Sequence, residues 1–363
     1  MALKIAAFEC YPTTQRGGSE KAFFEVLVGL SQLNFNIILF YNIEGDLVAK
    51  YEELGIKCIQ IPSLKIAYLN PKNWYRLFLI GKKIGQQQPD IIYINQLADS
   101  PIAAITKLFL KRVKTVCHLR VAKTGESKIF NLCGRFIDLF ITVNKLIKAE
   151  YQDIFIGQKI EIVNDGILIP EKVYTLKKKP RFNVVYLGRI SKEKGILELI
   201  NTWKILLKQY ELEINLSITG PAVSENEIEF KKEVQIQINH AGLSHLIHLN
   251  HPIDDVINYL SNFDFLVFPS TINESFGRTI PESILAGVPV FARNIGIVSE
   301  ILAPEKEKLI FNTEEELAFQ IKEFYSKGLS INIEALQQHI IQHYDVQKNV
   351  LLISKNLAKV ALA

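Results

Sequence analysis

Residues 265–292, FLVFPSTINESFGRTIPESILAGVPVFA, contain the pattern that decides the fold. Residues 265–269 form a short apolar run that predicts a buried strand, and residues 279–286 have the length and spacing of a helix, which Gly287 ends. A second apolar run follows at 288–292. A strand, a helix and another strand in this order predict two parallel strands joined by a crossover helix, the unit from which α/β proteins are built.

The same alternation extends outward over the whole chain, in two series. Further strands are expected at 3–9, 36–42, 57–62, 90–95, 114–120, 139–144 and 159–164, and then at 182–187, 213–219, 246–249 and 308–311. Helices are expected between them, including 21–33, 74–87, 101–110, 195–209 and 227–241, and three more, 314–325, 334–343 and 346–362, end the chain. We therefore expect an α/β protein with two doubly wound, Rossmann-like parallel sheets facing a cleft and a helical C-terminal tail.

The two series are separated by a stretch that contains two prolines, a run of three lysines at 177–179 and little apolar periodicity. We expect one domain at 1–165, a linker at 166–181, a second domain at 182–343 and a final helix at 344–363. The lysine run is most simply a solvated hinge.

Composition excludes several classes of protein. The 363 residues carry a net charge of +4 and are 48% hydrophobic, which argues against disorder, and no apolar run reaches the ~18 residues of a membrane-spanning helix. Residues 1–165 hold 21 Lys and Arg against 15 Asp and Glu, and the remainder 21 against 23, too small an asymmetry for a dedicated nucleic-acid binder. Four dispersed cysteines without a Cys-x-x-Cys or Cys/His pattern indicate a reduced, cytoplasmic protein with no metal site.

A double-glycine turn, Arg-Gly-Gly-Ser-Glu at 16–20, follows the first strand and opens a helix. Gly17 and Gly18 would let backbone N–H groups approach a phosphate, whereas a tight turn capped by Ser19 is the alternative. The turn matches neither Gly-x-Gly-x-x-Gly nor the P-loop pattern, so dinucleotide and P-loop functions lose support.

A second turn, Gly-Arg-Ile-Ser-Lys-Glu-Lys-Gly, follows the first strand of the second series. It starts at Gly188 and places the guanidinium of Arg189 and the ammonium of Lys194 around a strand-to-helix connection. These cations could neutralise a leaving group with two phosphates, or they could be an ordinary charged surface turn.

The opening stretch carries two carboxylates, Glu274 in the loop and Glu282 in the following helix. They could hold the hydroxyl groups of two sugars, and backbone N–H groups at 276–278 could meet a phosphate. A lone Glu-x7-Glu is a common accident, but the flanking Ser-Phe-Gly and Ala-Gly-Val-Pro-Val make this one far more specific.

His118 ends a predicted strand, where site residues collect in parallel sheets. Its imidazole could contact a sugar, act as an acid or base, or be structural. Four other histidines are expected to be solvated rather than metal ligands. They are His240, His245, His248 and His251.

A basic amphipathic stretch contains Trp74, Tyr75 and Phe78. We expect these aromatic side chains to lie in the core, with a solvated basic face; the alternative is contact with an anionic membrane surface. The basic residues are Lys72, Arg76, Lys82, Lys83, Lys107, Lys111, Arg112 and Lys114.

Together these motifs resemble those of the GT-B glycosyltransferases of the retaining group 1 type, glycosyltransferase family 4. The resemblance covers essentially the full chain, from the Gly-Gly-Ser-Glu turn and His118, through the hinge at 164–166 and the Arg189 turn, to the Glu-x7-Glu block and residues 296–300. It implies transfer of a sugar from a UDP- or GDP-linked donor to a glycan or lipid-linked acceptor, with retention of anomeric configuration, in cell-surface polysaccharide biosynthesis.

The resemblance also implies roles for individual residues. Residues 1–165 would be the acceptor side, 182–343 the nucleotide-sugar-binding domain, and 344–363 a helix that crosses back to the first domain. The implied contacts are Arg189 and Lys194 with the diphosphate, Glu282 with the ribose, Glu274 and His118 with the transferred sugar, Phe276 and Gly277 through backbone donors, and Gly17, Gly18 and Gly188 near the donor. No metal or nucleic acid is expected, and a peripheral contact with the inner face of the membrane is the remaining partner.

Three departures from the family pattern bear on donor and acceptor preference. The hinge reads Asn-Asp-Gly-Ile at 164–167 where Asn-Gly-Val/Ile-Asp is usual, Gly296 stands where two glycines are usual, and residues 143–144 lack a small hydroxyl residue. Two alternatives stay open: a nucleotide-sugar epimerase of the same fold, and an inactive subunit that binds a sugar nucleotide or associates with the membrane.

Overall fold

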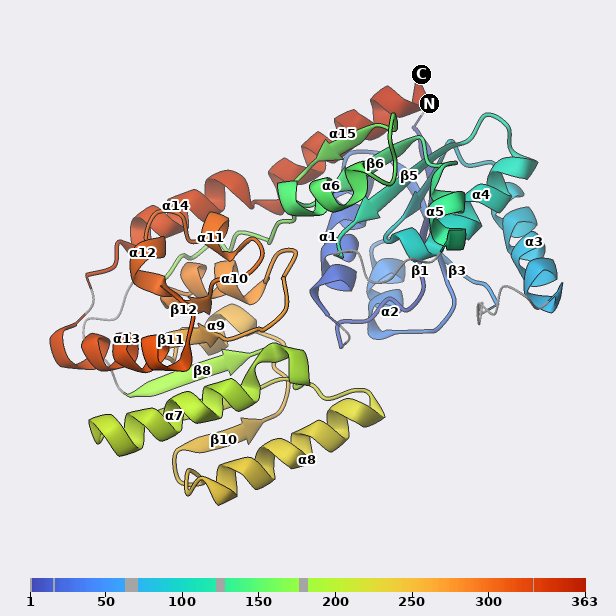
Figure 1. The fold of residues 1–363 in the computed structure, drawn as a ribbon. Helices are drawn as coiled ribbons and strands as arrows, with labels where there is room; N and C mark the ends of the chain where they lie inside the picture. The colour runs from blue at the N-terminus through green and yellow to red at the C-terminus, as the bar shows by residue number, and fades with distance from the viewer. Residues whose placement is uncertain (1, 16, 63–70, 122–127, 176–181, 329) are drawn as a thin grey trace. The chain divides into compact units, whose positions relative to one another are not determined.

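The chain forms two compact units, seen in a computed structural model that describes residues 2–15, 17–62, 71–121, 128–175, 182–328 and 330–363 (Figure 1). Unit 1 comprises residues 1–168 and 346–363, and unit 2 comprises residues 169–345. Arg16 and the lysine run at 177–179 lie outside the described residues.

Unit 1 is built on a seven-stranded parallel sheet with the order β3-β2-β1-β4-β5-β6-β7. Its strands are β1 (Lys4–Glu9), β2 (Asn36–Tyr41), β3 (Lys57–Gln60), β4 (Ile91–Ile94), β5 (Lys114–Leu119), β6 (Leu139–Thr142) and β7 (Ile160–Ile162). The direction of winding reverses between β1 and β4, which pair directly, with Ile5 opposite Ile91. Such a reversal opens a crevice at the carboxyl ends of the two strands, where ligands bind in doubly wound folds.

Helices cover both faces of this sheet. One face packs against α1 (Gly18–Gln32), α2 (Asp46–Glu53) and α15 (Val346–Ala361), and the other against α3 (Pro71–Gly85), α4 (Ser100–Phe109) and α6 (Lys145–Gln152). The short helix α5 (Lys128–Gly134) lies on α4. α15 packs closely against α1. A Cβ added at Gly29 would lie 2.9 Å from the Val350 side chain, so glycine allows this approach.

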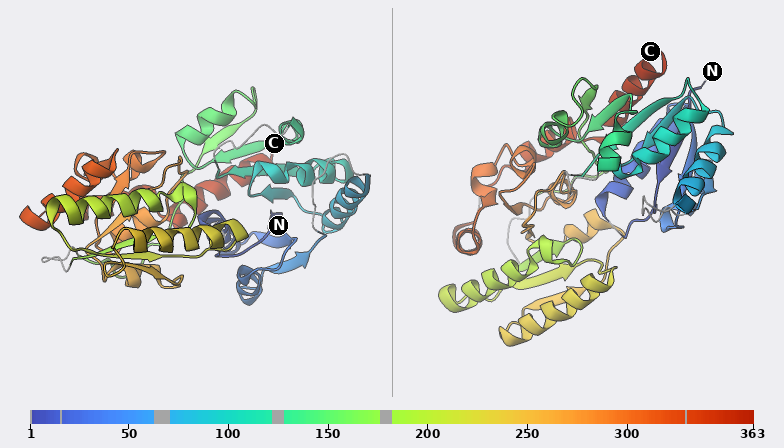
Figure 2. Two further views of the ribbon diagram at one scale, coloured as in Figure 1. Left: turned by 60° about the horizontal axis from the view of Figure 1, so that its bottom comes forward. Right: turned by 45° about the vertical axis from the view of Figure 1, so that its right-hand side comes forward.

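Unit 2 repeats the arrangement with six parallel strands in the order β10-β9-β8-β11-β12-β13. The strands are β8 (Asn183–Leu187), β9 (Asn215–Thr219), β10 (Ile247–Asn250), β11 (Phe265–Phe268), β12 (Val290–Arg293) and β13 (Ile310–Phe311). The helices are α7 (Ile196–Tyr210), α8 (Glu225–His240), α9 (Val256–Leu260), α10 (Thr279–Leu285), α11 (Val298–Ile301), α12 (Lys306–Leu309), α13 (Glu314–Lys327) and α14 (Ile333–His343). The long helices α7 and α8 lie side by side (Figure 2), and the winding reverses between β8 and β11.

The expected fold class, two doubly wound parallel sheets with C-terminal helices, is confirmed, and every predicted strand is present with ends shifted by at most a few residues. These strands were predictable because helices bury both of their faces, so each strand is a continuous apolar run. Among the described residues, no helix combines the length and apolar character needed to cross a membrane.

The expectation that the aromatic side chains of α3 lie in the core is wrong. Trp74, Tyr75 and Phe78 are 45%, 64% and 44% exposed. The buried side chains of this helix are Leu77, Ile80 and Ile84. α3 is apolar around most of its circumference, and periodicity alone could not tell which side faces the sheet.

Candidate active site

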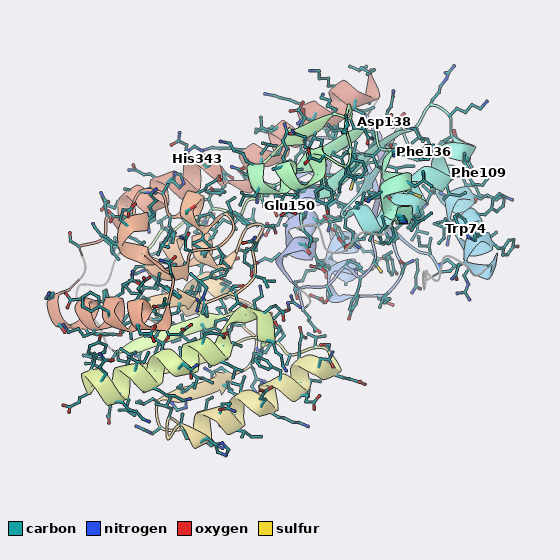
Figure 3. All side chains as sticks on the ribbon, viewed as in Figure 1. Trp74, Phe109, Phe136, Asp138, Glu150 and His343 are labelled. Atoms are coloured by element: carbon teal, nitrogen blue, oxygen red, sulfur yellow. The ribbon has the colours of Figure 1, made fainter. Side chains whose placement is uncertain are left out.

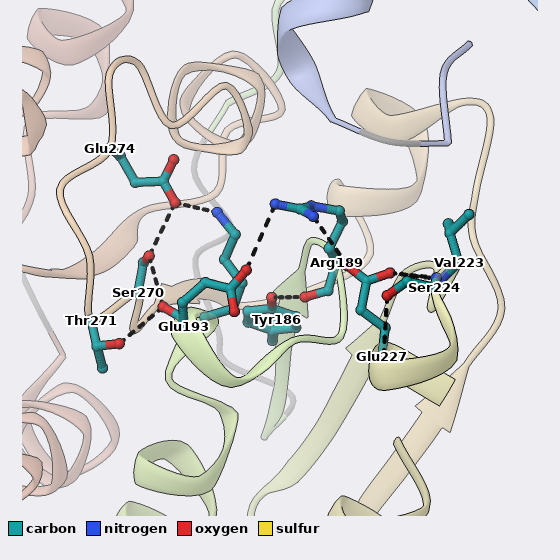
Figure 4. Close-up of polar contacts among 10 residues, drawn as sticks. Tyr186, Arg189, Glu193, Val223, Ser224, Glu227, Ser270, Thr271 and Glu274 are labelled. Carbon is teal, nitrogen blue, oxygen red and sulfur yellow. Dashed lines mark hydrogen bonds and ion pairs between the residues drawn. The ribbon is translucent and has the colours of Figure 1, made fainter. Parts of the chain in front are cut away.

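The loops that follow β8 and β11 meet at the carboxyl edge of the unit 2 sheet. Because these strands are neighbours across the reversal point, residues far apart in sequence come together there. Lys194 and Glu274, 80 positions apart, form an ion pair through Nζ and Oε1, and Figure 4 shows the surrounding polar contacts. The structure thus brings together three of the residues singled out in the sequence, because Arg189 belongs to the same loop as Lys194.

Glu274 is held by a second partner on its own loop. The Ser270 hydroxyl donates to Glu274 Oε1 at 3.0 Å. Lys194 and Glu274 are both only 17% exposed, so their attraction is weakly screened. Lys194 and Ser270 therefore orient the carboxylate through Oε1, and neither of them contacts Oε2.

Arg189 lies between two carboxylates. Its Nη1 is 3.0 Å from Glu227 Oε1, and its Nη2 is 3.9 Å from Glu193 Oε1. Burial favours a higher pKa for Glu227, but hydrogen bonds from the backbone N–H groups of Ser224 and Val223, and the Arg189 charge, outweigh burial and lower the pKa. Glu227 is thus an ionised anchor that holds the guanidinium at the sheet edge.

Local backbone geometry sets the path of the Arg189–Lys194 loop. Gly195 has φ +71°, and a Cβ there would lie 2.0 Å from the carbonyl oxygen of Pro269. The backbone N–H and the hydroxyl of Thr271 donate to the Glu193 carbonyl at 2.9 and 3.0 Å. The two loops are therefore joined backbone to backbone, which fixes the distance that the Lys194 side chain has to span.

A third segment supports the Glu274 loop. Gly296 has φ +51°, and a Cβ there would lie 2.4 Å from the Glu274 carbonyl oxygen. The Gly296 N–H donates to Asn273 Oδ1 at 3.1 Å. The single glycine at this point is enough for the close approach that positions Glu274.

The segment between Glu274 and Glu282 packs into unit 2 and leads into α10. Phe276 is buried, with its ring centroid 5.6 Å from that of Tyr344, so its side chain belongs to the core of unit 2. Gly277 has φ +66° and turns the chain into α10. Thr279, the first residue of α10, has a buried Oγ1 without a hydrogen-bond partner among the described residues. No pattern in the sequence singles out Thr279.

Glu282 lies in the middle of α10, as its spacing from Glu274 predicts. It is 6% exposed, and its Oε1 accepts from Nε of Arg278 at 3.1 Å. Arg278 is one helical turn away and therefore orients the carboxylate.

The double-glycine turn lies in unit 1. Gly17 is the N-cap of α1 in an extended conformation, and Gly18 is the first helical residue. The suggestion that Ser19 caps the helix is wrong, because its hydroxyl donates instead to Glu20 Oε2 at 2.6 Å. The first N–H groups of α1 therefore have no side-chain cap, which leaves them available to an anion.

His118 is buried in the sheet of unit 1, one residue before β5 ends. Its Nδ1 is 2.8 Å from the Tyr93 hydroxyl and 3.0 Å from Arg120 Nη2. A guanidinium can only donate, so Nδ1 accepts and the neutral ring carries its proton on Nε2. Burial, and then the Arg120 charge, holds the pKa of His118 well below its ordinary value. Nε2 is buried and has no partner among the described residues.

Arg120 is the centre of a buried network that the sequence did not reveal. It forms an ion pair with Asp165, and its Nε donates to Asn95 Oδ1 at 2.8 Å. Asn95 in turn donates to Glu9 Oε2 at 2.6 Å, and burial raises the pKa of Glu9 well above its ordinary value. The departure from the usual hinge motif thus supplies the counterion of Arg120. The available signal was position, because Glu9, Asn95 and Arg120 all stand at strand ends.

The expectation that four further histidines are solvated is confirmed. His240, His245, His248 and His251 are all exposed. Gly188, the last of the predicted donor-binding residues, directly follows β8, and a Cβ there would lie 2.9 Å from the Tyr186 hydroxyl.

Comparison with known proteins adds sequence relatives. Residues 171–344 match the family described as Glycosyl transferases group 1. The capsular polysaccharide biosynthesis glycosyltransferase CapM of Staphylococcus aureus is 30% identical over 139 residues, which are 38% of this chain and 34% of CapM. The glycosyltransferase CapH of the same organism is 20% identical over 298 residues, 76% of this chain and 78% of CapH. The match to CapM thus spans only about a third of that protein's length.

Solved structures resemble the chain over nearly its full length. Anabaena Alr3699/HepE in complex with UDP and glucose has a TM-score of 0.82 at 19% identity, covering 98% of this chain and 100% of the other. A glycosyltransferase from Rickettsia africae also has a TM-score of 0.82 at 19% identity. Residues 171–344 thus match the group 1 glycosyl transferases, and the two units have the GT-B fold of the solved structures.

Proposed function

We propose that the protein is a retaining glycosyltransferase that moves a sugar from a nucleotide-sugar to an acceptor hydroxyl group. The observation that carries the proposal is the Lys194–Glu274 pair beside Arg189, at the carboxyl ends of β8 and β11. UDP is the favoured donor nucleotide, with GDP next, because the structurally similar HepE binds UDP and glucose. The capsular polysaccharide relatives support a glycan or lipid-linked acceptor in cell-surface polysaccharide biosynthesis.

In the proposed reaction the bond between sugar C1 and the leaving diphosphate oxygen breaks, and a bond from the acceptor oxygen to C1 forms on the same face. The acceptor proton passes to the leaving phosphate. Negative charge therefore grows on the diphosphate, and Arg189 and Lys194 are the cations assigned to it. Without substrate their charges are balanced by Glu193, Glu227 and Glu274, so the cations are held in place before the diphosphate arrives.

Glu274 and Glu282 are assigned to sugar hydroxyl groups. Lys194 and Ser270 contact Oε1 of Glu274, which leaves Oε2 as the proposed acceptor for the transferred sugar. Glu282, oriented by Arg278, is assigned to the ribose. Backbone N–H groups at Phe276 and Gly277 are assigned to the donor, and so are those of Gly188 and, from unit 1, Gly17 and Gly18.

His118 is assigned the role of a hydrogen-bond donor to the transferred sugar. Its Nδ1 is occupied as an acceptor, and its Nε2 carries the proton and has no partner among the described residues. A ring held neutral in this tautomer can donate to a hydroxyl group but is not suited to general-base catalysis. Of the alternatives that the sequence left open for His118, the proposal therefore takes contact with the sugar.

The proposed site of action is the cytoplasm, with a peripheral contact to the membrane where a lipid-linked acceptor is used. No metal is assigned a role, because Arg189 and Lys194 supply the positive charge that a metal would otherwise bring to the diphosphate. Activity is therefore expected to persist in EDTA. Nucleic acid is not an expected partner.

The first experiment is a thermal-shift screen of UDP- and GDP-sugars, followed by NMR of the product formed with and without acceptor. We expect a nucleotide-dependent rise in Tm and a product that keeps the anomeric configuration of the donor. Lys194→Ala is expected to lower kcat on the order of 10²–10³-fold. The matched control is Lys192→Ala on the same turn, because the Lys192 side chain is 75% exposed.

Each alternative gives a different result in the same experiment. Interconversion of the donor without acceptor would identify an epimerase, and a Tm shift without turnover would identify an inactive binding subunit. If no donor is turned over and Glu282→Ala leaves nucleotide binding unchanged, the proposal fails.

A further inference from the structure

A band of exposed apolar side chains runs across α3, α4 and α5 of unit 1; we define it as the α3–α5 face. Its members are Trp74, Tyr75, Phe78 and Leu79 on α3, Leu108 and Phe109 on α4, and Leu132 and Phe136 at α5, between 36% and 72% exposed. Figure 3 labels Trp74, Phe109 and Phe136, which lie along the same side of the unit. Exposed aromatic and aliphatic groups gathered in this way are unusual on a protein surface that meets only water.

The α3–α5 face is continuous because its helices pack closely. The rings of Phe78 and Phe109 lie edge to face with centroids 5.0 Å apart. A Cβ at Gly81 would come within 3.1 Å of the Phe109 ring, so this glycine allows the two helices to approach. Lys107 Nζ donates to the Phe136 carbonyl at 3.1 Å, which joins α4 to the end of α5.

The net charge around this face is positive, and the carboxylate of Asp138, close to Phe136, is paired with Lys107. Neither α3 nor α4 contains an aspartate or glutamate. Four exposed basic residues next to the apolar band form no ion pair among the described residues. They are Arg76, Lys82, Lys111 and Arg112. A protein partner would have to bring its own matching carboxylates, whereas an anionic bilayer supplies negative charge over the whole area.

We propose that the α3–α5 face docks unit 1 on an anionic lipid surface. Trp and Tyr prefer the interface between headgroups and acyl chains, and Trp74 and Tyr75 are the members of the band nearest the start of α3. The chain enters α3 after β3 ends, so the start of α3 belongs to the carboxyl edge of the sheet, as does His118. Docking would therefore bring the carboxyl edge of the sheet to the membrane. This inference deepens the proposed function, and it rests on that function in one respect: the purpose of docking, which is the capture of a lipid-linked acceptor.

The test is binding of the full chain to sedimented vesicles of phosphatidylcholine alone and with 30% phosphatidylglycerol. We expect binding to the anionic vesicles, at least tenfold weaker binding to the neutral ones, and loss of binding as salt rises from 0.05 to 0.5 M. The double variant Tyr75→Ser/Phe78→Ser is expected to lower the partition coefficient at least tenfold. Lys82→Gln/Lys111→Gln is expected to lower it about 25-fold, about fivefold per charge.

The matched control is Leu351→Ser/Leu352→Ser, since both leucines are 48% exposed on α15 of the same unit. It should leave vesicle binding unchanged. A second readout uses the native tryptophans, because Trp203 is 1% exposed and Trp74 is the exposed one. Brominated acyl chains in anionic vesicles should quench the emission of Trp74, and Trp74→Phe should abolish that quenching.

Equal binding to both vesicle types, no binding of the unmodified chain, or an unchanged partition coefficient for both test variants overturns the proposal. So does self-association in the absence of lipid that Tyr75→Ser/Phe78→Ser abolishes, because that result assigns the α3–α5 face to a second copy of the chain. UDP is added to every variant as a Tm control. Failure of vesicle binding with an intact UDP response rejects docking alone, and the reverse result rejects the donor assignment alone.

Discussion

At the scale of single residues, the carboxyl edge of the unit 1 sheet contains a carboxyl group, that of Asp99, whose pKa is raised by burial. Asp99 is 8% exposed, and burial raises its pKa to about 8, with a side-chain hydrogen bond from Gln96 offsetting part of the effect. Its Oδ2 has no hydrogen-bond partner among the described residues. Folding therefore holds a proton on Asp99 over a pH range in which the unfolded chain releases it.

This gives a pH-dependent prediction for Asp99→Asn. Because the pKa of Asp99 is higher in the folded than in the unfolded chain, its contribution to stability is complete below about pH 4 and is lost as pH rises to about 8. The variant does not titrate, so its stability relative to the unmodified protein should rise through that range by a few kcal/mol and level off above it. Tm measured from pH 4 to 9 tests this. The exposed Asp153→Asn serves as control, and a difference that stays flat with pH would contradict the prediction.

At the scale of elements, the loops after β8 and β11 depend on glycine where the backbones touch. Gly195 and Gly242 have nearly the same positive φ, +71° and +70°. A Cβ at Gly242 would meet nothing within 4 Å, whereas one at Gly195 would strike the Pro269 carbonyl. Alanine variants of these two glycines therefore separate the cost of a left-handed backbone from the additional cost of a steric clash.

Gly242→Ala is expected to cost about 1 kcal/mol, the strain of a left-handed residue. Gly195→Ala carries the same strain and must also displace the β11 loop, for a total of about 2–4 kcal/mol. It should also weaken the UDP-induced rise in Tm, because Lys194 and Glu274 would separate. Thermal unfolding with and without UDP measures both effects, and equal behaviour of the two variants would remove Gly195 from the architecture of the site.

At the scale of the whole molecule, helix α15 belongs to unit 1, although the whole of unit 2 separates it in sequence from the rest of that unit. α15 packs against α1 and adds five residues to the core on that side of the sheet. They are Val346, Val350, Ile353, Leu357 and Val360. The backbone N–H of Val346 donates to the Ile167 carbonyl, and the Asn349 amide donates to the Asn164 carbonyl. Residues 1–168 therefore lack part of the unit 1 core until residues 346–360 have been made.

Leu357→Ala should accordingly destabilise unit 1 by about 2–4 kcal/mol, since this side chain is fully buried. Leu352→Ala, on the exposed side of the same helix, should change stability by less than about 0.5 kcal/mol. Calorimetry reports the result as a shift of the transition that involves unit 1. Equal shifts for the two variants would show that α15 does not stabilise unit 1.

Local elements were predictable from the sequence, whereas packing and long-range pairing were not. Strands such as β4 and β11 were predictable because each is a short, continuous apolar run. The exposed side of α3 was not predictable, because apolar residues surround the helix and only its packing on the sheet shows which of them are buried. The ion pair of Arg120 with Asp165 was missed because the partners are 45 residues apart and Asp165 departs from the family motif.

The sequence by itself determined the two parallel sheets, the places of the two glycine-containing turns and the resemblance to group 1 glycosyl transferases, since these follow from local patterns of polarity, glycine and charge. Only the tertiary structure decided that Lys194 reaches Glu274, that His118 presents a protonated Nε2, and that Trp74 and Tyr75 are exposed. Strand order and helix packing bring distant residues together, and no local pattern contains the resulting distances.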